Sequence, residues 1–362
     1  MKATDRALAR IMLAAAPVML MAAPAAAQQS YSNLFVFGDS LVDSGNAQAA
    51  RLASGGADPA PAAAGYFQGR FSNGYNFADY LSIAMGDGPA TADAYGGLNF
   101  SVGGAQAREM AGDASPSFAE QIGRFADSGK VFDSQSLVLV TFGGNDVRSE
   151  LNRFGIFVAA GGRPQDFVAD FTASLAAFRT GLDNLYARGA RNFIVTGLPN
   201  IGQIPDVTLR NLPVLSTVGE TFSRQLNSGY NSLTNTDSLT GIDDVVGAFG
   251  GATGANAQFF DLFAYQQRIN ANPVAFGLPA TLDRTSACLR IPGAAPDCDG
   301  LVYFDTIHPT RQLHEAIAGG LTTQLGIAAV PEPSNWLLMI AGFALVASTM
   351  RRRRYAVRVV YA

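Results

Sequence analysis

Three short apolar runs, each ending at glycine, place the strongest constraint on the fold of this 362-residue chain. They are Leu34–Phe37 before Gly38, Leu137–Phe142 before Gly143-Gly144, and Phe193–Thr196 before Gly197. Short apolar runs without polar alternation are typical of strands buried on both faces. Ala257–Phe260 is a weaker fourth run of the same kind. We therefore expect four buried strands.

Helical patterns separate these runs. They are expected at Asn76–Met85, Phe118–Ala126, Gln165–Arg188, Val218–Leu233 and Thr310–Leu325. Pro164 suits a first helical position, and Gly189 suits a helix exit. Ala53–Gly65 is rich in Ala, Gly and Pro and is expected to be a surface loop. Strands that alternate with helices predict an α/β fold with a parallel sheet covered on both faces.

The composition fits one large domain and excludes some functions. Hydrophobic residues make up 48% of the chain, charged residues make up 15%, and the net charge is −4. This small net charge gives no reason to expect nucleic-acid binding, which usually shows as a basic patch or stripe. Two cysteines and two histidines, scattered along the chain, do not form the spaced clusters of a metal site, so no metal is expected.

The N-terminus has the pattern of a signal peptide over residues 1–27. Three basic residues precede the apolar stretch Ile11–Ala23, and Ala25-Ala26-Ala27 offers a cleavage site. A mitochondrial-type presequence or a plain membrane anchor is the alternative. Export would favour a disulfide between Cys288 and Cys298, which are close in sequence.

The C-terminus has three parts in a fixed order. Pro331-Glu332-Pro333 is followed by the apolar run Trp336–Ala347 and then by four arginines from Arg351. This order resembles the PEP-CTERM sorting signal of Gram-negative bacteria. The resemblance implies that 331–354 is a transient anchor removed by a membrane protease, and that 355–362 is a cytoplasmic tail. The apolar run is shorter than the roughly 20 residues of a stable span, which favours a transient anchor. A permanent C-terminal membrane anchor is the alternative.

Ser40 follows the first expected strand in the turn Gly38-Asp39-Ser40. Ligands of open α/β folds bind beyond the carboxyl ends of the strands, so this serine is well placed for chemistry. A serine hydroxyl becomes nucleophilic when an adjacent base takes its proton. Its backbone N–H is expected to open a helix and to face developing negative charge. Taken alone, Asp39 or Ser40 is as well explained as a helix cap.

His308 is the best-placed base. It lies in Asp305-Thr306-Ile307-His308-Pro309, where a carboxylate three residues earlier on a short turn can reach Nδ1 and leave Nε2 free. This is the logic of a Ser-His-Asp triad. A histidine satisfied within a loop is the structural alternative. His314, the other histidine, is expected on the surface of the final helix.

Donors for an oxyanion are expected at two further glycine-containing turns. Asn145 offers a side-chain amide in Gly143-Gly144-Asn145-Asp146, and Gly103-Gly104 offers a backbone N–H that no side chain blocks. Each motif alone is a common turn pair. Together, and in this order along the chain, they favour an acyl-transfer site.

These residues together resemble the SGNH, or GDSL, family of hydrolases. Ser40 matches the first of its four blocks, Gly104 the second with Gly103 as the one-residue alternative, and Asn145 the third. Asp305 and His308 match the fourth. Two longer motifs, Phe37–Asn46 and Gly69–Gly74, are similar to those of the plant-type and bacterial lipase-like branch.

The resemblance covers most of a hydrolase domain at 28–330 and implies a three-layer α/β/α fold with a flavodoxin-like parallel sheet. It implies a triad of Ser40, Asp305 and His308, and an oxyanion hole formed by the N–H groups of Ser40 and Gly104 and by the Asn145 side chain. No cofactor is expected.

We expect an exported ester hydrolase of a Gram-negative bacterium, periplasmic, at the cell surface or extracellular. Its expected substrates are fatty-acyl esters, lysophospholipids, or acetylated or aryl esters of polysaccharides. Its expected partners are the export machinery and a sorting protease. An acyltransferase with the same triad and a non-catalytic surface binding protein on the same scaffold are the alternatives.

Overall fold

The computed structural model describes residues 30–327, apart from 111, 113, 231–239 and 294–296, and five residues near the C-terminus: 340, 342–344 and 347. The predicted signal peptide (1–27) and tail (355–362) lie outside the described residues, as does nearly all of the predicted sorting segment (331–354). Within the described part of the chain, no helix is long and apolar enough to cross a membrane.

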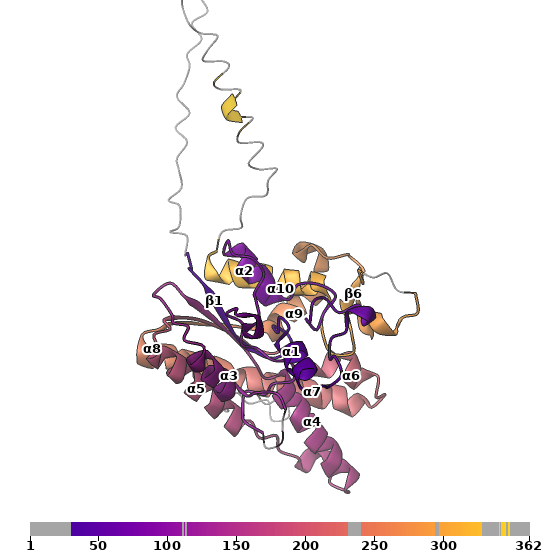
Figure 1. Cartoon of the computed structure of the whole chain (residues 1–362). Coiled ribbons are helices and arrows are strands. Elements are labelled where there is room, and N and C mark those ends of the chain that lie inside the picture. The colour runs from indigo at the N-terminus through magenta and orange to yellow at the C-terminus, as the bar shows by residue number, and fades with distance from the viewer. Residues whose placement is uncertain are drawn as a thin grey trace, which may run out of the picture.

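A parallel sheet forms the centre of the fold (Figure 1). Its strands, in spatial order, are β1 (Leu34–Gly38), β2 (Leu137–Thr141), β3 (Asn192–Thr196) and β4 (Asn256–Phe260). All three pairings are parallel and in continuous register. The four strands expected from the apolar runs are therefore confirmed.

The segment Leu98–Val102 extends the sheet on the free side of β1. Val36 donates its N–H to the carbonyl of Leu98 (3.1 Å), and the N–H groups of Phe100 and Val102 bond back to β1 at 2.8 and 3.0 Å. In chain order this segment is second, so the spatial order becomes 2-1-3-4-5. That is the flavodoxin-like order, whose switch point lies between β1 and β2.

Helices cover both faces of the sheet. The α-helices are α1 (Asn46–Ala53), α2 (Phe77–Ala84), α3 (Phe118–Asp127), α4 (Gly144–Ala159), α5 (Thr172–Ala187), α6 (Pro205–Thr208), α7 (Pro213–Ser228), α8 (Ile242–Thr253), α9 (Leu262–Ala271) and α10 (Arg311–Leu325). Short 3-10 helices are η1 (Ala62–Ala64), η2 (Asp93–Tyr95), η3 (Pro164–Asp166), η4 (Ile201–Gln203), η5 (Pro273–Phe276) and η6 (Cys288–Arg290). Figure 1 shows α2, α9 and α10 on one face and α3, α5 and α8 on the other. The predicted three-layer α/β/α fold is confirmed.

Aromatic side chains anchor α3 to the sheet. Phe35 and Phe37 alternate along β1 with residues of the opposite face, so both point to the same side. The Phe37 ring lies 6.0 Å from that of Phe118 and 5.4 Å from that of Phe100, and the Phe35 ring lies 5.7 Å from that of Phe125. All five rings are buried. Their packing fixes the depth of β1 and therefore the place where the chain turns at Ser40.

One predicted helix is shorter than expected. The pattern over Gln165–Arg188 predicts one continuous helix, but Pro164 opens only η3, and α5 begins at Thr172. Between them, Phe167 packs against Phe154 (5.4 Å) and Phe171 packs against Phe222 (6.1 Å). Packing of these two rings against α4 and α7 outweighs the propensity of the segment for helix.

His314 is buried, so the prediction that it lies on the surface of the final helix is wrong. Its exposed fraction is 1%, and its ring lies 5.7 Å from that of Phe77 on α2. The reason is that α10 packs directly on α2, so the face of α10 that carries His314 is an inner face. Burial, together with the charge of His308, lowers the pKa of His314 to about 3.

A second, two-stranded parallel sheet joins β5 (Asp283–Ala287) and β6 (Leu301–Tyr303). The expected pairing of Cys288 with Cys298 is present in the structure as a disulfide that joins the start of η6, just after β5, to the loop before β6, with the Cα atoms 5.8 Å apart. Both cysteines are buried with Phe304, and Tyr66 and Leu301 pack against them. We call these five residues the disulfide cluster.

Candidate active site

The turn Asp305–His308 follows β6 after one residue, Phe304, and is closed by hydrogen bonds of its backbone N–H groups and of the Phe304 N–H. Phe304 donates its N–H to the carbonyl of His308 at 2.8 Å. Asp305 Oδ1 accepts the N–H groups of Ile307 (2.8 Å) and His308 (2.7 Å). These bonds hold the carboxylate under the imidazole that follows it, as the spacing Asp-x-x-His predicts.

Ser40, His308 and Asp305 form a continuous hydrogen-bonded series. The distance from Ser40 Oγ to His308 Nε2 is 2.8 Å, and that from His308 Nδ1 to Asp305 Oδ2 is 2.7 Å. His308 is only 7% exposed. Burial of Asp305 opposes its ionisation, but the charge of His308 and the hydrogen bonds outweigh burial and hold the pKa of Asp305 at about 2. Asp305 is therefore ionised at neutral pH.

Ser40 lies in a tight turn that Asp39 organises. The Asp39 carbonyl accepts the N–H groups of Val42 and Asp43, and its Oδ1 accepts the N–H of Leu41 at 3.0 Å. The expectation that Ser40 opens a helix is wrong, because this turn does not continue and α1 begins at Asn46. Asp39 is fully buried, and burial raises its pKa to about 7. Asp39 therefore closes a turn without capping a helix, since the N-cap of α1 is Gly45, and this turn leaves Ser40 partly exposed.

Asp43 links the Ser40 turn to the Gly103-Gly104 loop. Its carboxylate accepts three N–H groups at the start of α1 and the N–H of Gly103 at 2.8 Å. Because the Gly103 N–H is engaged by Asp43, Gly104 is the better candidate for a free backbone donor. Gly104 has a φ of +89°, and an added Cβ there would lie 2.6 Å from Ser115 Oγ, so both conformation and space favour glycine.

Asn145 lies in the first turn of α4 at the carboxyl end of β2, not in an open turn as the Gly-Gly-Asn-Asp pattern predicts. Its side-chain Nδ2 donates to the carbonyl of Ala105 at 3.0 Å, and Arg148 donates to its Oδ1 at 3.4 Å. A carboxamide has two N–H donors, so one remains after the bond to Ala105. The two contacts fix which end of the amide carries the donors.

One cavity of about 290 Å³ collects the residues of the four sequence blocks. Its described lining is Ser40, Ala47, Ala50, Arg51, Pro59, Phe71, Val102, Gly103, Gly104, Ala114, Ser115, Asn145, Arg148, Ile307 and His308. It lies beyond the carboxyl ends of β1 and β2, which is the switch point of the sheet. All predicted catalytic and oxyanion residues except Asp305, which contacts Nδ1 of the cavity residue His308, therefore line the same cavity.

Sequence reasoning missed four residues of this site: Asp43, Tyr66, Phe71 and Arg148. Phe71 lies against the imidazole of His308, with ring centroids 5.1 Å apart. Tyr66 donates its hydroxyl to Asp305 Oδ2 at 2.9 Å. Asp43 and Phe71 belong to the two longer motifs, which give a usable signal. Tyr66 and Arg148 lie outside every motif, so nothing in the sequence distinguishes them.

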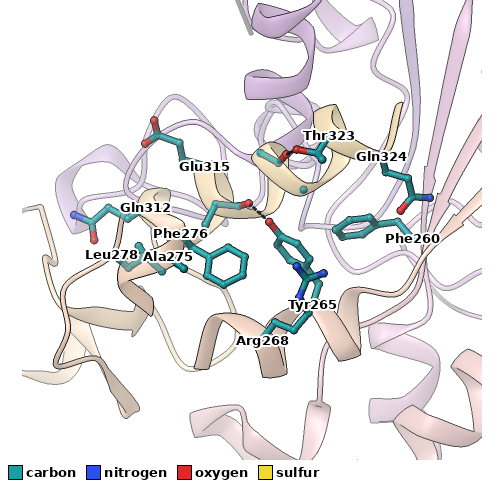
Figure 2. Close-up of a pocket in the computed structure, with 14 residues that line it drawn as sticks. Phe260, Tyr265, Arg268, Ala275, Phe276, Leu278, Gln312, Glu315, Thr323 and Gln324 are labelled. Atoms are coloured by element: carbon teal, nitrogen blue, oxygen red, sulfur yellow. Dashed lines mark hydrogen bonds between the residues drawn. The ribbon is translucent and has the colours of Figure 1, made fainter. Parts of the chain in front are cut away.

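A larger cavity, of about 630 Å³, lies between α9, η5 and α10 (Figure 2). Figure 2 shows Phe260, Tyr265 and Phe276 along it, with Arg268 beside Tyr265. It shares no lining residue with the Ser40 cavity among the described residues. Among the residues that the structure describes, no group of three or more His, Cys, Asp and Glu side chains could hold a metal ion.

An α/β/α fold with a serine–histidine contact at the carboxyl edge of its sheet is typical of carboxylic ester hydrolases. Comparison with known proteins agrees: the family model described as GDSL-like Lipase/Acylhydrolase matches residues 34–321. The chain therefore belongs to this family, and it is a carboxylic ester hydrolase.

Its similar relatives include several proteins of Arabidopsis thaliana named GDSL esterase/lipase. One is 27% identical over 341 residues, which cover 85% of this chain and 92% of the relative. The GDSL esterase/lipase LTL1 is 26% identical over 83% of this chain and 88% of its own length. The GDSL esterase/lipase EXL6 is 24% identical over 85% and 95%.

Proposed function

We propose that this protein hydrolyses esters through an acyl-enzyme on Ser40, with His308 as the base and Asp305 as its partner. The observation that carries the proposal is the series of two short contacts, Ser40 to His308 at 2.8 Å and His308 to Asp305 at 2.7 Å. An ionised Asp305 stabilises the imidazolium that forms when His308 takes the Ser40 proton.

In the first half of the reaction, Ser40 Oγ attacks the carbonyl carbon while its proton passes to His308 Nε2. The bond from carbon to the alcohol oxygen then breaks, and the alcohol leaves with the proton from His308. In the second half, His308 takes a proton from water, the hydroxide attacks the acyl carbon, and Ser40 leaves with its proton restored. No step uses a metal or an organic cofactor.

The proposed oxyanion hole consists of the Ser40 and Gly104 backbone N–H groups and the remaining N–H of the Asn145 amide. Its support is that all three residues line one cavity with His308, and that the competing Gly103 N–H is engaged by Asp43. Preorganised donors of this kind stabilise the transition state by about 3–4 kcal/mol each.

The cavity favours a small acyl group. Its volume of about 290 Å³ is at the lower end of the range of ligand pockets, and small apolar side chains such as Ala47, Ala50 and Ala114 form part of its wall. We therefore expect short-chain esters to react faster than long-chain esters. A series of p-nitrophenyl esters from acetate to palmitate measures this preference directly.

The Ser40→Ala variant tests the proposed mechanism on a short-chain chromogenic ester. We expect kcat to fall by about 10³-fold or more, with the melting temperature within a few degrees of wild type. Ser54→Ala, on the exposed end of α1, is the matched control and should keep full activity. Equal rates for Ser40→Ala and wild type would reject Ser40 as nucleophile. Product analysis with added alcohol separates hydrolysis from acyl transfer at the same site.

We further propose that the working protein is exported and spans about Gln28 to Val330. The disulfide between Cys288 and Cys298 supports an oxidising compartment, and the family match at residues 34–321 lies inside this range. The intact mass of the protein recovered from its native host tests the boundaries. A mass that still includes residues 1–27 or 331–354 would contradict removal of that segment.

A further inference from the structure

The carboxylate of Asp305 is saturated by four donors, one of which comes from a distant loop. Oδ1 accepts two backbone N–H groups of its own turn, and Oδ2 accepts His308 Nδ1. The fourth donor is the hydroxyl of Tyr66, 239 residues earlier, which reaches the same Oδ2 at 2.9 Å. An ionised carboxylate offers about four acceptor positions, so Tyr66 fills the last of them.

We propose that Tyr66 is a positioning residue that holds Asp305 Oδ2 in line with His308. The inference rests on the proposed role of Asp305 as the partner of His308. Without the Tyr66 hydroxyl, one acceptor position of this charged carboxylate would have no partner, so Asp305 would be held less firmly in line with His308. Burial and the neighbouring negative charge of Asp305 raise the pKa of Tyr66 above its usual value, so the phenol keeps its proton and remains a donor.

Packing against the other members of the disulfide cluster fixes the Tyr66 ring. Tyr66 packs edge-on against Phe304, with ring centroids 5.0 Å apart, and also contacts Phe71 at 6.4 Å. Phe304 immediately precedes Asp305, and its carbonyl accepts the N–H of Leu289, which follows Cys288. The hydroxyl and the ring of Tyr66 are thus held by the same few residues that carry Asp305.

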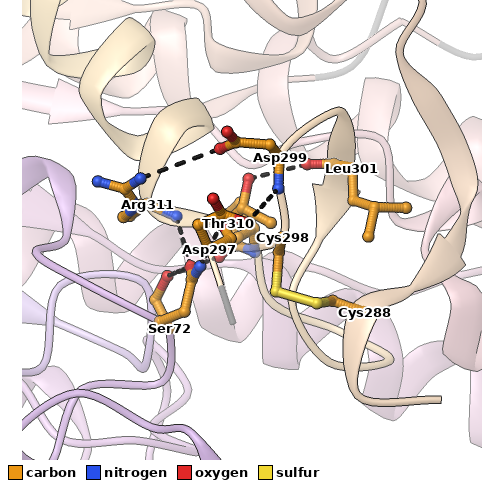
Figure 3. The surroundings of a disulfide bond; sticks show 10 residues. Ser72, Cys288, Asp297, Cys298, Asp299, Leu301, Thr310 and Arg311 are labelled. Carbon is orange, nitrogen blue, oxygen red and sulfur yellow. Dashed lines mark hydrogen bonds and ion pairs between the residues drawn. A yellow bond between two sulfur atoms is a disulfide. The ribbon is translucent and has the colours of Figure 1, made fainter. Parts of the chain in front are cut away.

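The disulfide segment is also tied to the far side of the Asp305–His308 turn (Figure 3). Thr310 donates its hydroxyl to the carbonyl of Leu301 at 2.9 Å, and Figure 3 shows both residues beside the bond between Cys288 and Cys298. Asn73 donates to the carbonyl of Asp297 at 2.7 Å and accepts the N–H of Arg311. The disulfide therefore braces the turn from both ends and keeps it close to Tyr66.

Tyr66→Phe removes the hydroxyl and keeps the ring. We expect kcat for a short-chain ester to fall about tenfold, because the lost hydrogen bond aligns Asp305 with His308 for catalysis. KM should stay within twofold, because Tyr66 is not proposed to contact the substrate. The loss also leaves more negative charge on Oδ2 for the imidazolium. The acidic limb of kcat/KM should therefore move to higher pH by a few tenths of a unit or more.

Tyr75→Phe is the matched control. Tyr75 lies nine residues further on, and its ring packs against Phe67 and Tyr80 at 5.2 and 5.9 Å, away from the triad. It should leave kcat and the pH profile unchanged. A Tyr66→Phe variant with wild-type kcat and a wild-type acidic limb would overturn the proposal. A fall in kcat and a shifted acidic limb in Tyr75→Phe, equal to those in Tyr66→Phe, would also overturn it.

The disulfide supplies an independent arm. The double variant Cys288→Ser/Cys298→Ser removes the disulfide brace and should lower kcat. Because the brace and Tyr66 both act through Asp305, adding Tyr66→Phe to this variant should lower kcat by much less than the product of the two separate fold-losses. Fully multiplicative losses would overturn the coupling. If Tyr66→Phe melts early, the downfield Nδ1 proton resonance of His308 in the folded fraction provides the readout, and an unshifted resonance counts against the proposal. Wild-type activity in Ser40→Ala would instead reject the triad itself.

Discussion

Replacement of His314 by leucine should make the protein more tolerant of acid. His314 is 1% exposed in wild type, and its Nδ1 has no hydrogen-bond partner among the described residues. Burial, with the charge of His308, lowers its pKa from 6.5 to about 3. The folded protein therefore holds His314 neutral, whereas the unfolded chain protonates it below about pH 6.5.

The magnitude follows from this difference in proton binding. Because the folded pKa lies below the unfolded pKa, the unfolded state binds the extra proton and stability falls as pH falls. Each pH unit below 6.5 costs about 1.36 kcal/mol until the folded pKa is reached. At pH 4.5, two units below, His314 alone should remove about 3 kcal/mol of the free energy of unfolding.

Urea unfolding at pH 7.5 and at pH 4.5, for wild type and His314→Leu, measures this term. Other titrating groups contribute equally to both proteins and cancel in the comparison, and any packing difference enters at both pH values. The expected result is that wild type loses about 3 kcal/mol more than His314→Leu between the two pH values. Parallel losses in the two proteins would refute the reasoning, because they would mean that His314 is protonated in the folded state.

Three further changes test the site and its surroundings. Asn145→Ala should lower kcat on a chromogenic ester by about 100- to 1,000-fold with little change in KM, and a rate within threefold of wild type would exclude its amide from the oxyanion hole. Gly103→Ala places a Cβ 2.4 Å from the Phe71 ring and should lower the free energy of unfolding by about 1–3 kcal/mol in urea; an unchanged midpoint would contradict this. Arg70→Met leaves the buried Asp79 carboxylate without the arginine that binds it at 2.6 Å and should cost about 3–5 kcal/mol, whereas replacing both partners by apolar residues should cost less.

The strands were predictable because their signal is local. Each run of apolar residues is as long as the strand that it forms, and each ends at the glycine where the backbone turns out of the sheet. Helices with a clear cap were equally accessible. Asn76 and Ser117 each accept an N–H of the first helical turn, and α2 and α3 begin at the residues that follow them.

The helices that were missed have weak local signals. α4 begins at Gly144, and the preceding Gly143 has a φ of +116°. Two adjacent glycines are typical of a loop, so the sequence gives no helix signal there. α8 contains two adjacent glycines, and α9 has no clear apolar stripe in its sequence. Packing on the sheet and on neighbouring helices stabilises them, and tertiary contacts of this kind outweigh propensity.

The site residues also divide into those with a local sequence signal and those without one. Ser40 and His308 were predictable because each lies in a short motif whose own turn is encoded locally by Asp39 and Asp305. The contact between them spans 268 residues, and only the order of the strands brings it about. Tyr66 has no motif, because its position depends on packing within the disulfide cluster, whose members come from three separate segments. Residues that support a catalytic group from a distant loop therefore leave no local pattern, and the hydrogen bond of Tyr66 to Asp305 becomes visible only in the folded chain.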